Sequence, residues 1–127
     1  MNNALLVGIG GFIGSMVRYW MSSYVQQLTK HTVFPLGTLA VNVLGCFMIG
    51  VLSQLAEDYG IFTSEARLLM FTGFLGAFTT FSAFGNETMN LLREGQTLLA
   101  LGNITGHIVL GLGAVWLARS LVYLMWT

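Results

Sequence analysis

Four long apolar stretches are the feature that most limits what this chain can fold into. They cover about residues 4–24, 36–55, 68–92 and 98–123 of 127 residues. A helix needs roughly 20 apolar residues to cross the hydrocarbon core of a bilayer, which is about 30 Å thick. Four crossings use most of the chain. The sequence therefore predicts an all-α integral membrane protein, with residues 1–127 forming a single four-span domain.

The composition agrees with a bilayer as the main partner. Charged residues make up 8% of the chain, against about 25% in soluble proteins, and the mean hydropathy is +0.76. So few charges cannot cover a surface that faces water. The formal net charge is zero and no cluster of lysine or arginine occurs, which excludes nucleic acid as an expected partner.

Basic residues near the ends of the spans give almost no preferred orientation. The side with the first and third connections holds Arg18, Lys30 and Arg93, and the opposite side holds Arg67 and Arg119. Such residues normally decide which face stays in the cytoplasm. A chain with so small a bias can insert in both orientations, and two opposite copies can pair about a two-fold axis in the membrane plane. We therefore expect an antiparallel homodimer.

The glycines of the first stretch suggest helix packing rather than a nucleotide-binding loop. Ile13 stands where a G-x-G-x-x-G motif starting at Gly8 would need its last glycine, and no strand is expected before it. Two G-x-x-x-G pairs instead predict close helix contacts. They are Gly10 with Gly14 and Gly102 with Gly106.

No arrangement of residues indicates an enzyme. A nucleophile with a neighbouring base is not visible, and His31 and His107 are too far apart in sequence to suggest a metal site. The single Cys46 lies in an apolar run and is expected to pack there.

Polar residues inside the spans leave several alternatives open. Arg18 either faces a cavity, where it would attract anions, or extends its side chain to the interface. Asn42 either joins two helices or lines a path. Glu87 fits an interfacial carboxylate, a partner of Arg18 or a proton carrier. His107 either packs in the core or lines a pore with Asn103, four residues earlier on the same helical face.

The segment 73–84 predicts a break near the middle of the third span. Its glycines and its Thr-Thr-Phe-Ser run are poor helix formers. Unwound backbone at membrane depth must be buried in protein or line a cavity, where its freed carbonyls can bind a cation. Phe81 and Phe84 would share one face if the helix resumes there, either as core residues or along a path.

Taken together, these features resemble the Fluc (CrcB-type) fluoride channels, small dual-topology membrane proteins of bacteria. The resemblance covers nearly the whole chain and depends on three motifs. They are residues 10–14 continuing to Arg18-Tyr19, residues 37–42 with Gly45, and residues 73–84 ending in Thr-Thr-Phe-Ser-Ala-Phe.

The resemblance implies an antiparallel homodimer in the bacterial inner membrane, with two pores that export fluoride passively and give fluoride resistance. It also implies a central structural sodium ion held by the main-chain carbonyls of Gly76 and Thr79. Arg18 would lie toward a pore entrance. The implied fluoride pathway contains Phe81, Phe84, Asn42, Asn103 and His107, and Ser82 would supplement the rings as a polar donor.

Two other functions compete with this one. A small proton-coupled multidrug antiporter has four spans and a similar length, but it needs an acidic residue in the first span, where this chain has Arg18. Glu87 would have to replace that residue. A membrane assembly subunit without transport activity would explain the glycines but not the polar third span.

Overall fold

The computed structural model describes residues 2–127 and contains four helices long and apolar enough to cross a membrane. The first two are α1 (Asn3–Leu28) and α2 (Leu36–Tyr59), and the last is α6 (Thr97–Trp126). The third crosses as consecutive segments, namely α3 (Ser64–Arg67), the π-helix η1 (Leu68–Leu75), α4 (Gly76–Phe78) and α5 (Phe81–Arg93). The expected all-α architecture with a broken third helix is confirmed.

Several helices continue beyond the apolar stretches that predicted them. α1 ends at Leu28 and α2 at Tyr59, each about one turn later than expected, because a helix can extend past the hydrocarbon core into the interface. α2 begins directly after Pro35, where the missing N–H costs little.

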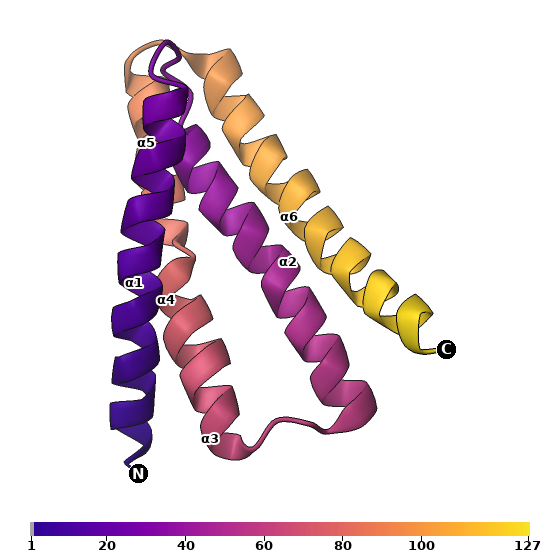
Figure 1. Cartoon of the computed structure of the whole chain (residues 1–127). Helices are drawn as coiled ribbons and strands as arrows, with labels where there is room; N and C mark the ends of the chain where they lie inside the picture. Colours follow the sequence, from indigo (N-terminus) through magenta and orange to yellow (C-terminus); the bar gives the residue numbers. More distant parts are fainter. Residues whose placement is uncertain (1) are drawn as a thin grey trace.

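The four spans form two closely packed pairs. α1 lies against η1 and α4, and α2 packs along α6 (Figure 1). Both termini and the connection between α2 and α3 lie at one end of the molecule, whereas the other two connections lie at the opposite end. This alternation fixes which charges share a membrane face.

Glycines allow the backbones of α1 and η1 to touch. A Cβ atom on Gly10 would collide with the Leu69 carbonyl oxygen, and one on Gly14 would collide with that of Phe74. This G-x-x-x-G contact is confirmed. Cβ atoms on Gly102 and Gly106 would lie 3.7–3.8 Å from side chains, an ordinary contact distance, so close packing at the second pair is not found among residues 2–127.

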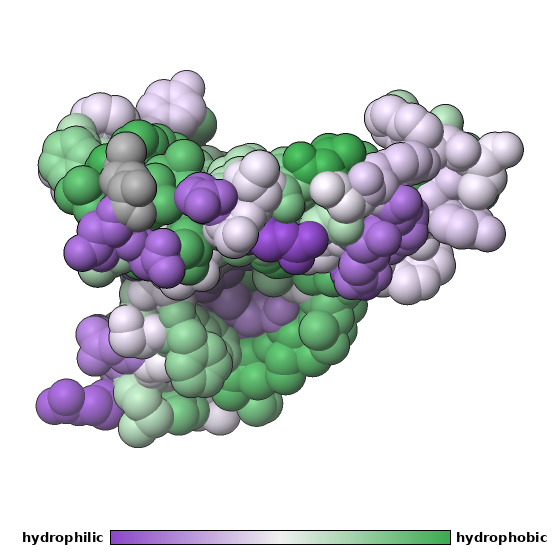
Figure 2. Space-filling model, turned by 90° about the horizontal axis from the view of Figure 1, so that it is seen from below, coloured by the Kyte–Doolittle hydropathy of each residue, from purple (hydrophilic) through white to green (hydrophobic). Residues whose placement is uncertain are grey.

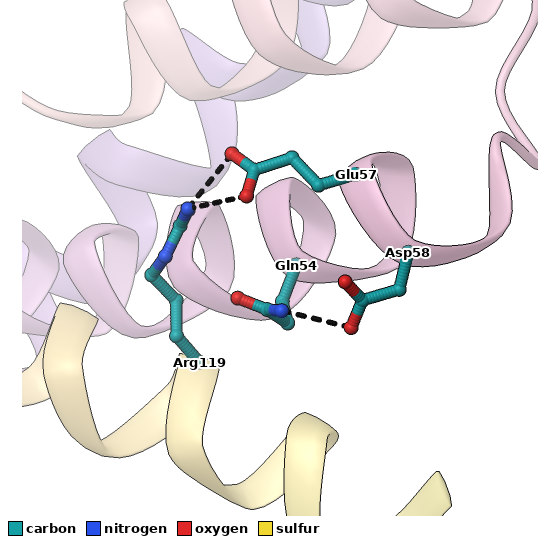
Figure 3. A network of polar contacts seen from close by, with 4 residues as sticks. All are labelled: Gln54, Glu57, Asp58 and Arg119. Carbon is teal, nitrogen blue, oxygen red and sulfur yellow. Dashed lines mark hydrogen bonds and ion pairs between the residues drawn. The ribbon is translucent and has the colours of Figure 1, made fainter.

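An ion pair joins α6 to the last turns of α2. Arg119 Nη2 on α6 donates to both Glu57 oxygens at 2.7 Å, and beside it, within α2, Gln54 Nε2 donates to Asp58 Oδ2 at 2.8 Å (Figure 3). Viewed from the end that holds the termini, hydrophilic residues interrupt the hydrophobic surface and also lie within a recess between the helices (Figure 2).

Candidate ion pathway

The break between α4 and α5 is the centre of the candidate site. Thr79 and Thr80 have extended backbone angles, with ψ of 157° and 108°. The Thr80 N–H donates to Asn42 Oδ1 at 2.8 Å, and Asn42 Nδ2 donates to the Thr80 carbonyl at 3.1 Å. The hydroxyl of Thr80 accepts the Ala83 N–H and so caps α5. The α2 side chain thus replaces the helical hydrogen bonds that the break removes.

The break also frees backbone carbonyls. In a continuous helix the Gly76 carbonyl would accept from Thr80 N–H, and the Thr79 carbonyl from Ala83 N–H, but both of these N–H groups donate to side chains instead. Arg18 Nη1 lies 3.5 Å from the Thr79 oxygen. Hard cations such as sodium prefer oxygen ligands, so these carbonyls suit a cation, which at Thr79 would compete with Arg18.

An open cavity of about 790 Å³ lies on one side of the break. Its lining is mainly apolar, and Phe81, 83% exposed, places part of it at the protein surface. The rings of Phe81 and Phe84 are 5.5 Å apart between centroids, and the Phe84 and His107 rings are 4.3 Å apart. The sequence-predicted residues in this lining are Asn42, Gly76, Thr79, Phe81, Phe84 and His107.

A second cavity, of about 650 Å³, lies on the other side of the break and is more polar. Thr80 lines both cavities. Arg18, Ser82 and Glu87 line the second one. Arg18 is half-buried near the middle of α1 and is turned toward the break, which favours the cavity-facing alternative over extension to the interface.

Asn103 lies away from both cavities. It is fully buried, and its Nδ2 donates to the Thr88 hydroxyl at 2.9 Å, joining α6 to α5. His107, one turn later, does line the first cavity. The structure therefore separates two residues that helical spacing placed on one path.

Sequence reasoning missed the partner of Glu87. Thr38 Oγ1 donates to Glu87 Oε1 at 2.7 Å. Of the three alternatives for Glu87, a salt bridge with Arg18 is not found within residues 2–127, where the ion pair joins Arg119 and Glu57. Thr38 lies four residues before Asn42, on the same face of α2, and this spacing was the available signal.

Comparison with known proteins identifies relatives over nearly the whole chain. The family described as "CrcB-like protein, Camphor Resistance (CrcB)" matches residues 5–119. A "Fluoride-specific ion channel FluC" from Methylobacillus flagellatus is 46% identical over 122 residues, which are 96% of this chain and 95% of the relative. "Fluoride-specific ion channel FluC 1" from Methanosarcina acetivorans is 42% identical, covering 94% of this chain and 89% of the relative. A "Fluoride-specific ion channel FluC" from Chlorobium phaeobacteroides is 48% identical, covering 83% of this chain and 84% of the relative.

Proposed function

This chain belongs to the CrcB family, and on that premise we propose that it is a fluoride-selective channel through which fluoride leaves the cell passively. The observation that carries the proposal is its identity of 42–48% with relatives named fluoride-specific ion channels. The chain is accordingly a multi-pass membrane protein and not an enzyme. Nothing among these relatives supports a multidrug antiporter.

The working unit that we propose is an antiparallel homodimer with two pores. Asn42, His107 and the freed carbonyls lie beside a cavity that reaches the surface of the single chain. Lipid cannot satisfy the freed carbonyls, which have lost their helical donors, so a protein surface must close this side of the cavity. A second copy in the opposite orientation supplies that surface, and the weak charge bias supports opposite insertion.

Fluoride would pass the break between the two cavities. On the polar side Arg18 attracts the anion, and the Ser82 hydroxyl replaces part of its water shell. On the other side the edges of Phe81 and Phe84 continue the path, and Asn42 lines it while holding the break in place. An aromatic ring is positive at its edge, so it can face an anion without holding it tightly, as conduction requires. His107 extends this lining, whereas Asn103 supports it by fixing α6 to α5.

The membrane potential gives the direction of flow. Hydrogen fluoride enters a cell uncharged, dissociates near neutral pH and leaves the anion inside. An inside-negative potential favours anion exit by about 2.3 kcal/mol per 100 mV. A passive pore is therefore sufficient for fluoride resistance.

The direct experiment is fluoride release from liposomes that contain only the purified protein, with valinomycin to balance charge. We expect fluoride efflux without chloride efflux. Changing Phe81 and Phe84 together to Ile should reduce the rate below about a tenth, because the replacement side chains offer no positive ring edge. Phe12→Ile is the matched control, since Phe12 is 66% exposed on α1. Absence of fluoride efflux from folded dimers in sodium would contradict the channel.

We further propose that sodium binds at the centre of the dimer through the carbonyls of Gly76 and Thr79. Their release from helical hydrogen bonding supports this site. A cation that binds only the folded dimer stabilises it, so replacing sodium by N-methylglucamine should lower the melting temperature of the dimer by about 4 °C or more. Equal melting temperatures in both salts would contradict a structural sodium ion.

A further inference from the structure

The side-chain amide of Asn42 has all of its hydrogen atoms in use. Its Oδ1 accepts the Thr80 N–H, and its Nδ2 donates to the Thr80 carbonyl. The remaining Nδ2 hydrogen points to His107 Nε2, 3.0 Å away. The amide orientation is fixed, because only the oxygen can accept from the Thr80 N–H.

The surroundings of His107 also fix which of its nitrogens carries hydrogen. Nδ1 lies 2.9 Å from the Asn103 main-chain carbonyl, which can only accept, so Nδ1 is the donor. The Asn42 NH₂ group, which can only donate, faces Nε2, so Nε2 keeps its lone pair and accepts. The contacts on both sides of the ring require a neutral imidazole.

A second proton on His107 would place an N–H group against the NH₂ group of Asn42. Turning the Asn42 amide over would offer its oxygen to His107 but would set its NH₂ group against the Thr80 N–H. In either arrangement a hydrogen bond at the break is lost. A charged imidazole would also be drawn to the Phe84 ring, 4.3 Å away between centroids.

We propose that neutral His107 is a positioning residue that holds Asn42 across the break, so that protonation of His107 releases the Thr80 N–H and slows fluoride conduction. The predicted effect on fluoride flux rests on the proposed channel function. The structural coupling itself, from His107 through Asn42 to Thr80, depends only on the hydrogen bonds described above.

Other ionisable groups near His107 come from each neighbouring helix. Glu87 on α5 lines the second cavity, across the break. Cys46 on α2 lines the same cavity. Arg18 on α1 reaches the adjacent Thr79 carbonyl. The test must therefore assign any pH dependence to His107 itself.

The flux experiment compares the unmodified protein, His107→Gln and His31→Gln between about pH 8 and pH 5.5, the range in which histidine changes charge. Protein-free liposomes correct for leakage of hydrogen fluoride at each pH. His31 is the only other histidine and lies exposed in the connection between α1 and α2.

Fluoride efflux through the unmodified and His31→Gln proteins should slow about tenfold in acid, as expected for loss of a buried hydrogen bond. His107→Gln keeps an acceptor without titrating, so its rate should not change with pH. Three flat profiles, or three equal decreases, would overturn the proposal.

Hydrogen exchange of the Thr80 amide tests the same coupling without fluoride. In the unmodified protein this exchange, corrected for its intrinsic pH dependence, should accelerate when NMR shows that His107 becomes protonated. Unchanged protection would overturn the positioning role, even if His107→Gln failed to fold. If no fluoride passed at any pH, the channel function would fail, while the exchange experiment would still decide the role of His107.

Discussion

Individual polar side chains within the spans find partners on other helices. Thr38 on α2 donates to Glu87, and Asn103 on α6 donates to Thr88. Lipid offers no replacement for such bonds. Two buried oxygens, Glu87 Oε2 and Asn103 Oδ1, nevertheless have no partner within the described residues. The loss of one more donor should therefore be costly at these positions.

Replacing Thr38 by Val tests that cost. Valine keeps nearly the same shape but removes the hydroxyl that donates to Glu87 Oε1, which leaves neither carboxyl oxygen with a donor. The free energy of unfolding should fall by about 1–3 kcal/mol, as measured by denaturant unfolding in detergent. Thr72→Val, at an exposed site in η1, should change it by less than about 0.5 kcal/mol. Equal effects would show that the hydrogen bond contributes nothing specific.

Pairs of helices depend on where their backbones meet. Gly10→Ala should weaken the contact between α1 and η1, because the added methyl group meets main-chain atoms of Leu69 and Phe74. We expect a loss of about 1–3 kcal/mol in unfolding free energy. Gly8→Ala adds the same group two residues earlier, where nothing lies within 4 Å, and should be neutral or stabilising by up to about 1 kcal/mol. A similar loss in both variants would contradict the close contact.

The sequence could predict elements more readily than their partners. The apolar stretches and the poor helix formers of segment 73–84 correctly predicted four spans and a broken third one. They could not predict that Asn42, 38 residues from Thr80, fastens the break. The G-x-x-x-G motif has the same limit, because the motif at Gly10 meets another backbone whereas the motif at Gly102 meets a side chain.

In the whole molecule, the basic residues at the two membrane faces are more evenly divided than the sequence indicated. Arg18 points to the break in the third span rather than to a membrane face. Lys30 and Arg93 then remain at one end, and Arg67 and Arg119 at the other. With two basic residues on each side, loop charge gives no preferred orientation. The proposed antiparallel dimer needs such a balance, because both orientations must be made from one sequence.

Adding lysines should disturb this balance and separate the two orientations. Two lysines inserted after Asn2 should hold that end in the cytoplasm, so that every copy inserts the same way and fluoride efflux is lost. Both termini lie at one end of the molecule, so two lysines in the 29–34 connection should give the opposite orientation and be equally inactive. Expressing the two variants together should restore efflux, because opposite copies are available again to pair. Full activity of either variant alone, with its single orientation verified by cysteine labelling from one side, would contradict the antiparallel dimer.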